Sequence, residues 1–185
     1  AMVWKPFLLG TIYQAKGWTT SPFLLDTVKG DYMWRDMERR TGRLGIPFQR
    51  PKVFPAHSLL AARVMTAGCD THWCGEFAKG VFQAQFAKAE DIADAGTLRR
   101  ILSDHVDDPD HWLNLARSDA VKSRLRANTE HAADIGIFGA PSFRVGSEIF
   151  WGDDRLEDAI DWAQSQQARP RNTGGDGHAP SSLVM

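Results

Sequence analysis

Two places in the chain combine residue types that could do chemistry. Cys69, His72 and Cys74 stand together in CDTHWC, and a second stretch, residues 138–156, reads FGAPSFRVGSEIFWGDDRL. The two cysteines are separated by four residues, a spacing that excludes a CxxC redox pair. Structural zinc sites usually use two separated ligand pairs, and only one group is present here. We therefore expect no metal site, but buried or partly buried thiols near a helix junction.

The second stretch combines a turn, a hairpin and an acidic helix start. Ala140-Pro141 precedes a strand-like run, and an X-Pro peptide bond is the one kind with a realistic chance of being cis. A cis turn would leave the carbonyl and amide of Ala140 pointing outward, where an extended peptide ligand could pair by strand addition. Gly152-Asp153-Asp154 then opens the last predicted helix. One Asp there is ordinary capping, whereas the second could bind an ammonium group, so both interpretations stay open.

The elements before this stretch are predominantly helical. Met2–Trp4 is expected as a short strand, Phe7–Ala15 as a helix-compatible stretch and the turn-rich 17–28 as a loop. Helical spacing follows over 29–44, with Gly45 as its C-cap, and 46–55 contains three prolines and must be an extended connector. Further helices are predicted over 57–70, 72–90, 94–105, 109–117 and 118–134. In 72–90 one face carries large apolar side chains, which we expect in the core: Trp73, Phe77, Val81, Phe82 and Phe86.

The periodicity changes after residue 135. SFRV and EIF are short β-rich runs around Gly146-Ser147, typical of a hairpin. DRLEDAIDWAQSQ is a final amphipathic helix, whose predicted inward residues are Leu156, Ala159, Ile160 and Ala163. The order of strand, helices, hairpin and helix indicates a small sheet domain, 1–16 and 136–167, interrupted by a helical insertion, 17–135. Residues 168–185, rich in Gly, Pro and polar residues, are expected to form a disordered tail.

Length and composition restrict the classes of protein. The chain has 185 residues, enough for one domain with a sizeable insertion, and a formal net charge of −1 with scattered basic residues. A nucleic-acid binder would normally show a basic stripe, so that class is disfavoured. No apolar run reaches the ~18–20 residues that span a bilayer, and no secretory signal opens the chain. We expect a cytoplasmic protein.

Several motifs, taken in order, resemble one known family. They are WKPFLLG near the start, VKGDYMWRDMERR, GIPFQRPKVFP and SLLAAR in the middle, and FGAPSF…VGSEIFWGDDRL near the end. From about residue 3 to 165 the chain resembles the 2-hydroxychromene-2-carboxylate isomerases, relatives of kappa-class glutathione transferases and, more distantly, of DsbA-type oxidoreductases. The resemblance implies an α/β fold: a thioredoxin-like sheet domain with a large all-helical insertion, truncated at its N-terminus.

The resemblance also implies a cofactor and a reaction. Members of this family bind glutathione, whose thiolate adds to a conjugated aromatic-degradation intermediate, allows a bond to rotate and is then expelled. The resemblance implies that Ala140, before a cis-like Pro141, pairs with the cysteinyl backbone of glutathione. Asp154 would meet the γ-glutamyl ammonium group. The expected partners are thus glutathione and a small aromatic or conjugated substrate.

Three further positions have less defined roles. Asp153 stands where relatives usually have Asn or Ser, and Lys29 matches a family lysine at the ligand site. Arg155 could take a substrate carboxylate or bridge to a neighbouring acid, and both roles stay open. The substrate pocket would be lined by the helical insertion, where aromatics such as Trp34, Trp73 and Phe82 could serve.

The chain departs from the family in two ways. Trp18 occupies a position where relatives often have a polar residue. The family also begins with a strand and helix carrying an activating Ser, a segment without counterpart here, so Ser21 does not inherit that role and no catalytic residue is assigned. The family's first strand would lie centrally, beside both Met2–Trp4 and the hairpin. A displaced gene start, residues outside this sequence, or a partner chain closing the gap would each explain this difference.

Three functions remain in competition. The first is a glutathione-dependent isomerase or transferase, weak or inactive as this chain alone. The second is a catalytically inert, glutathione-binding or dimeric interaction module. The third, a thiol-disulfide oxidoreductase, is disfavoured by the missing CxxC motif. Relatives look dimeric, so we expect a homodimer.

Overall fold

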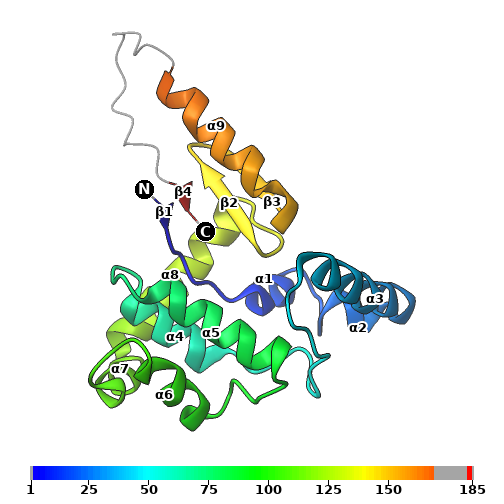
Figure 1. Ribbon diagram of the computed structural model, residues 1–185. Helices are drawn as coiled ribbons and strands as arrows, with labels where there is room; N and C mark the ends of the chain where they lie inside the picture. Colours follow the sequence, from blue (N-terminus) through cyan, green and yellow to red (C-terminus); the bar gives the residue numbers. More distant parts are fainter. Residues whose placement is uncertain (1, 169–182, 185) are drawn as a thin grey trace.

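The computed structural model describes residues 2–168 and 183–184 (Figure 1). The elements run β1 (Met2–Val3), α1 (Leu9–Ala15), α2 (Pro22–Leu25), α3 (Thr27–Leu44), α4 (Leu59–Gly68), α5 (Cys74–Ala87), α6 (Ala95–Ser103), α7 (Pro109–Leu115), α8 (Asp119–Asp134), β2 (Ser142–Val145), β3 (Glu148–Trp151), the 3-10 turn η1 (Asp153–Arg155), α9 (Leu156–Ala168) and β4 (Leu183–Val184).

The sheet is small and mixed, with the strand order β1-β4-β2-β3. Strand β4 is parallel to β1 and antiparallel to β2, and β2 pairs with β3 as the predicted antiparallel hairpin. Gly146 has φ 62° at the hairpin turn, a conformation that glycine adopts without a Cβ clash. Helix α9 covers one face, where Phe143, Val145 and Ala159 form a buried cluster.

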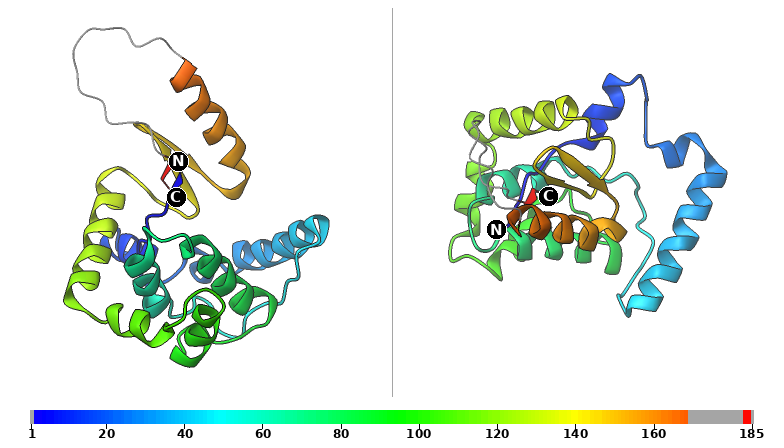
Figure 2. Two further views of the ribbon diagram at one scale, coloured as in Figure 1. Left: turned by 60° about the vertical axis from the view of Figure 1, so that its left-hand side comes forward. Right: turned by 90° about the horizontal axis from the view of Figure 1, so that it is seen from above.

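A second, larger core holds the helices together. Trp73 is 3% exposed and meets two other rings edge-on, Phe77 at 6.0 Å and Trp112 at 4.8 Å between centroids. This core is contributed by α4 to α7, which lie on the opposite side of the sheet from α9, while α2 and α3 project to one side (Figures 1 and 2). The expected combination of a small sheet and a helical part is therefore confirmed.

Helix α8 fixes the segment that enters from β1. The Leu8 backbone N–H donates to the Thr129 hydroxyl at 3.0 Å, and the Asn128 amide donates to the Pro6 carbonyl at 3.1 Å. These bonds satisfy backbone groups of a segment without regular structure, which would otherwise be costly to bury. They tie β1 to the helix that leads into β2.

Most predicted helices are confirmed, but the loop predicted over 17–28 is wrong. It contains α2 and the start of α3. The Ser21 hydroxyl accepts the Phe23 N–H at 3.3 Å, and the Asp26 carboxylate accepts the Lys29 N–H at 3.1 Å. Two successive N-caps thus convert a turn-rich stretch into helix.

Two predicted core residues lie on the surface. Phe82 is 63% exposed and Ile160 is 38% exposed. Each directly follows a buried residue, Val81 or Ala159, so it stands about 100° further around its helix. The apolar face of each helix is narrower than the sequence pattern indicates.

The disordered tail predicted over 168–185 falls mainly on residues outside the described ones. Ala168 ends α9, and Leu183–Val184 form the central strand β4. The rest of the predicted tail lies outside the described part of the chain, so the prediction of disorder stays a prediction. No helix in the described part of the chain is long and apolar enough to cross a bilayer.

Candidate functional site

The Ala140 turn leads from α8 into the first strand of the hairpin. The Ala140-Pro141 peptide bond is cis, as predicted, and both residues are exposed. The buried Ser142 hydroxyl donates to the Gly139 carbonyl at 2.8 Å. From the far end of the hairpin, the Gly152 N–H donates to the Pro141 carbonyl at 3.1 Å. The turn is therefore held at both ends, while Ala140 faces solvent.

Asp153 and Asp154 directly follow Gly152, the residue that donates the second of these hydrogen bonds. Gly152 has φ 116°, which residues with a side chain rarely adopt, and the chain then enters η1. Because Gly152 is bonded to Pro141, the start of η1 lies beside the Ala140 turn. The structure thus brings Ala140, Pro141, Asp153 and Asp154 to one end of the hairpin.

The two aspartates have different surroundings. Asp153 accepts a hydrogen bond from the Arg40 guanidinium of α3 at 2.6 Å, a contact that spans 113 residues of sequence. Asp154 accepts no side-chain hydrogen bond from the described residues, and Arg155 stands 3.7 Å from its carboxylate. Its side chain is 53% exposed. Asp154 is therefore the carboxylate that is available to an added cation.

Arg155 is surrounded by acids of its own segment. Its guanidinium lies 3.4 Å from the Asp158 carboxylate and donates to the Asp154 carbonyl at 3.3 Å. The bridging role is the one visible in the structure. The role toward a substrate carboxylate stays a prediction.

Lys29 lies at the opposite end of α3 from Arg40. Its ammonium group stands 5.9 Å from the centroid of the Phe23 ring. Arg40 follows Lys29 by eleven positions, which correspond to roughly 16 Å along the helix axis. Arg40, which the sequence did not single out, is the α3 cation that contacts the η1 turn.

An aromatic pair beside the turn was also missed from the sequence. Phe138 and Trp151 are 46% and 53% exposed, and their ring centroids are 4.9 Å apart in an edge-on arrangement. The Trp151 indole occupies the space that a side chain on Gly139 would need. Phe138 directly precedes the Ala140 turn in sequence and Trp151 directly precedes Gly152, and these positions were the available signal.

The aromatics proposed for a substrate pocket have other positions. Trp34 is 7% exposed, with Phe54 edge-on at 4.9 Å and the Arg50 guanidinium over its ring at 4.9 Å. Trp73 is in the helical core, and Phe82 lies on the outside of α5. Trp34 and Trp73 thus have little exposed surface, and their place in a substrate pocket stays a prediction.

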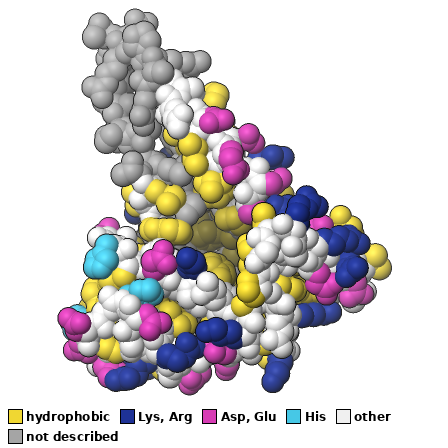
Figure 3. Space-filling model, viewed as in Figure 1, with side chains coloured by type: hydrophobic (Ala, Val, Ile, Leu, Met, Phe, Trp, Pro, Cys, Tyr) yellow, Lys and Arg dark blue, Asp and Glu magenta, His cyan; other side chains and the backbone are white. Residues whose placement is uncertain are grey.

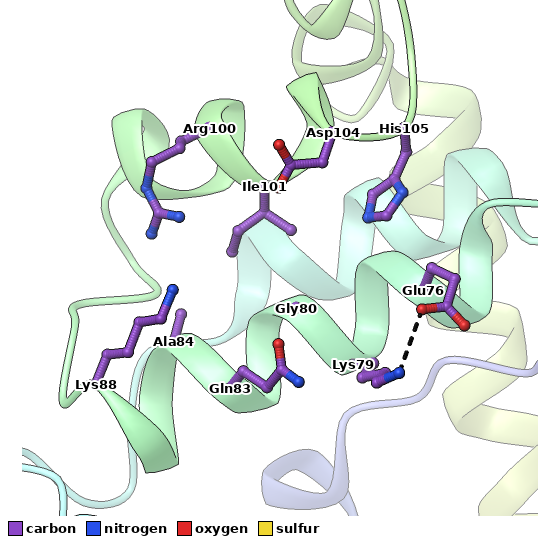
Figure 4. Close-up of a pocket in the computed structure, with 10 residues that line it drawn as sticks. All are labelled: Glu76, Lys79, Gly80, Gln83, Ala84, Lys88, Arg100, Ile101, Asp104 and His105. Atoms are coloured by element: carbon purple, nitrogen blue, oxygen red, sulfur yellow. Dashed lines mark ion pairs between the residues drawn. The ribbon is translucent and has the colours of Figure 1, made fainter. Parts of the chain in front are cut away.

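Two hollows can be made out in the part of the chain that the structure describes. Hydrophobic side chains gather in a recess below the hairpin, between the sheet and the helices beneath it (Figure 3). A polar hollow of about 210 Å³ lies between α5 and α6, where Arg100, Ile101, Asp104 and His105 face α5 (Figure 4). It is smaller than the ~300 Å³ at which ligand pockets begin, and the Ala140 turn does not line it.

Comparison with known proteins identifies the family. The profile of the family described as DSBA-like thioredoxin domain matches residues 1–161. The chain belongs to the DsbA-like thioredoxin domain family.

The relatives that the chain resembles are named either as a glutathione transferase or as an isomerase. The chain is 28% identical over 149 residues to glutathione S-transferase kappa 2 of Caenorhabditis elegans, covering 73% of this chain and 66% of that protein. It is 31% identical over 137 residues to 2-hydroxychromene-2-carboxylate isomerase of Pseudomonas putida, covering 70% and 63%. This DsbA-like chain thus spans less than two thirds of the length of these relatives.

A solved structure supports the fold independently. The chain matches a structure of 2-hydroxychromene-2-carboxylate isomerase with a TM-score of 0.75 and 23% sequence identity, covering 88% of this chain and 80% of that one. The thioredoxin-like fold expected from the sequence is therefore confirmed.

The cysteines of this DsbA-like protein are not arranged for redox chemistry. Cys69 is half-buried at the end of α4, Cys74 is buried at the start of α5, and both are free thiols, as predicted. Burial raises the pKa of Cys74 to about 11, and burial also raises the pKa of Cys69. Reactive thiols have a lowered pKa instead. Among the described residues no three His, Cys, Asp or Glu side chains gather as a metal site.

Proposed function

We propose that this chain binds glutathione and serves a glutathione-dependent cis-trans isomerisation of the 2-hydroxychromene-2-carboxylate isomerase type. Its relatives carry the names of such an isomerase and of a kappa-class glutathione transferase. One observation carries the proposal: the exposed residue Ala140 and the half-exposed Asp154 carboxylate, whose ion-pair partner is the adjacent Arg155, lie at the same end of one hairpin, linked through the Gly152–Pro141 hydrogen bond.

The residues present fit the chemical groups of glutathione. Ala140 has an exposed backbone, and an extended peptide recognises such an edge through main-chain hydrogen bonds. The Asp154 carboxylate accepts hydrogen bonds and carries the charge that an ammonium group needs. We assign Pro141 to holding the Ala140 backbone outward and Asp154 to the γ-glutamyl ammonium group.

The chemistry on the substrate would come from the bound cofactor. Glutathione supplies a thiolate that can add to a conjugated system and leave again. This chain's own residues bind and orient it. The exposed rings of Phe138 and Trp151 provide an apolar wall beside the turn for a conjugated substrate. Ser21 takes no part in thiol activation in this proposal, because its hydroxyl caps α2.

The proposal is tested by titrating glutathione into the protein in a calorimeter. Asp154→Ala should weaken binding by about 1.5–3 kcal/mol, a factor of roughly ten to 150 in Kd, as for a hydrogen bond to a charged group. Asp158→Ala is the matched control: it also removes a carboxylate beside Arg155, but from α9. Equal affinities of wild type and Asp154→Ala, or no binding by wild type, would overturn the proposal.

The inert binding module is the alternative that the same protein can test. Isomerisation of 2-hydroxychromene-2-carboxylate is followed spectroscopically with and without glutathione. Glutathione-dependent turnover that falls in Asp154→Ala supports the isomerase. Binding of glutathione without turnover supports the inert module for this chain.

A further inference from the structure

The polar hollow between α5 and α6 combines an apolar floor with a charged rim (Figure 4). Ala84 and Ile101, which line it, are 2% and 3% exposed. We propose that this hollow binds a small aromatic carboxylate, with the ring on the floor and the carboxylate between Lys88 and Arg100. The proposal goes beyond the proposed function, because the Ala140 turn does not line the hollow and no glutathione is required.

A glycine of α5 shapes the floor. A Cβ on Gly80 would stand 2.6 Å from the Ile101 side chain, so α6 approaches α5 as closely as a glycine allows. Ile101 belongs to the helical core, which fixes the floor from behind. Because Gly80 and Ala84 carry little or no side chain, the α5 part of the floor is flat and suits a ring. The volume of about 210 Å³ is equivalent to roughly seven water molecules, so it suits a single ring with one carboxylate.

Two cations point toward one another across one end of the hollow (Figure 4). Lys88 is the C-cap of α5, and Arg100 lies on α6. The Arg100 guanidinium pairs with the Glu90 carboxylate, whereas Lys88 has no ion-pair partner among the described residues. These three side chains carry a net charge of +1, which one bound carboxylate would balance.

Both cations keep hydrogen-bond donors for a ligand. A guanidinium has five N–H donors, and the hydrogen bond that Arg100 makes to Glu90 uses Nη2. The Lys88 ammonium group adds three donors. Hydrogen bonds between charged donors and a carboxylate are stronger than those between neutral groups. A carboxylate placed between Lys88 and Arg100 is therefore bound from both helices.

The end of α5 places Lys88 at the rim. The Lys88 N–H donates to the Gln83 carbonyl at 3.1 Å, five residues earlier, so the last turn is wider than an α-helical turn. Ala89 follows with φ 50°, which residues with a side chain rarely adopt. The chain thus turns sharply after Lys88 and brings Glu90 to Arg100 of α6.

The opposite end of the hollow is less suited to an anion. Lys79 is 3.6 Å from the Glu76 carboxylate, so its charge is paired (Figure 4). Asp104 follows Arg100 by four positions, roughly 6 Å along the helix axis, and would repel a carboxylate placed beside it. The charges therefore direct the carboxylate to the Lys88 end.

Titration of benzoate into the ¹⁵N-labelled full chain, followed by backbone amide shifts, tests the site. Saturable shifts centred on α5 and α6 are expected, with a Kd in the millimolar range or tighter for so small a ligand. Benzamide has the ring without the charge, and acetate has the charge without the ring. Each should bind at least about tenfold more weakly than benzoate. Absence of saturable shifts with benzoate, shifts centred on the Ala140 turn, or tighter binding of inorganic phosphate than of benzoate would overturn the proposal.

A pair of lysine variants tests where the carboxylate lies. Lys88→Met removes the ammonium group from an exposed side chain and should raise the Kd of benzoate about three- to fivefold. Lys79→Met is the matched control, because it removes a paired lysine of α5 that lies nine positions, roughly 13 Å, from Lys88. The control should change the Kd by less than about twofold. An unchanged Kd in Lys88→Met, or equal losses in both variants, would overturn the assignment of Lys88.

Discussion

At the scale of single residues, two neighbouring aspartates differ in their contacts: Asp153 makes a structural contact, and Asp154 is the candidate ligand contact. Asp153 is held by Arg40 of α3, whereas Asp154 has its carboxylate in solvent. Because η1 is one short turn, holding Asp153 also sets the direction of Asp154. Arg40 is therefore a positioning residue for the proposed glutathione site.

Replacing Arg40 should weaken glutathione binding at little cost in stability. Arg40→Met removes an ion pair whose side chains are 36% and 62% exposed. The free energy of unfolding measured in urea should therefore fall by less than about 1 kcal/mol. Glutathione affinity should fall about two- to fivefold, within the same ~1 kcal/mol. Arg39→Met, at an exposed neighbour on α3, is the control. A glutathione Kd that is the same in both variants would show that Arg40 does not position Asp154.

The two thiols should differ in reactivity with pH. Burial raises the pKa of Cys74 from an ordinary value near 9 to about 11, so its thiol stays protonated at neutral pH. Cys69, which is half-buried, should be alkylated first by iodoacetamide, and Cys74 should react only when the pH approaches 10–11 or the chain is unfolded. Intact mass spectrometry at pH 7.5 and pH 10 checks this. Faster alkylation of Cys74 than Cys69 in folded protein would contradict it.

The raised pKa of Cys74 also makes the free energy of unfolding depend on pH. The folded pKa of Cys74 lies above the unfolded one, so the native state prefers the protonated thiol. Its contribution to stability is complete below about pH 9 and is lost as pH rises toward 11. Cys74→Ala should therefore show a smaller loss of urea stability over this range than the wild type. An unchanged pH dependence would contradict this.

At the scale of elements, the junction of α4 and α5 depends on a glycine. A side chain at Gly68 would occupy the space of the Trp73 ring, which sits in the helical core. Gly42, in α3, has open space instead. The same substitution should therefore have opposite effects at these two helical positions.

Gly68→Ala should lower the free energy of unfolding by about 1–3 kcal/mol, because it overpacks the core. Gly42→Ala should leave it unchanged or raise it by up to about 1 kcal/mol, because alanine favours the helix. Urea denaturation of both variants provides the comparison. A Gly68→Ala variant as stable as Gly42→Ala would show that Trp73 can move.

At the scale of the whole molecule, the proposed site lies at the end of one of two separately packed clusters. The hairpin and α9 form one buried cluster, α4 to α7 form the other, and the Arg40–Asp153 contact bridges α3 to η1. A ligand that binds the folded hairpin end should therefore stabilise the native protein as a whole.

Glutathione at 100 times its Kd should raise the free energy of unfolding by about 2.7 kcal/mol, as expected for one site that exists only in the folded state. Thermal unfolding at increasing glutathione concentration measures this effect. The melting temperature of Asp154→Ala should not rise over the same concentrations. A rise of equal size in both proteins would place glutathione elsewhere.

The local sequence determined most helices, the hairpin and the Ala140 turn. Proline, glycine and periodic apolar residues act through neighbours within a few positions, so their effects are readable from sequence. Asp154 could also be proposed as a ligand residue from the sequence, because a second acid behind Gly152 exceeds what a cap needs, and this role stays a prediction. The family-specific motifs led to the thioredoxin-like fold.

The tertiary structure decided what depends on contacts between distant segments. The Arg40–Asp153 pair, the exposure of Phe82 and the burial of Trp34 and Trp73 depend on which helix faces touch, and periodicity does not specify that. The place of Leu183–Val184 is the clearest case. Its strand partners are β1, at the other end of the chain, and β2, about 40 residues earlier, and both are beyond the reach of any local pattern.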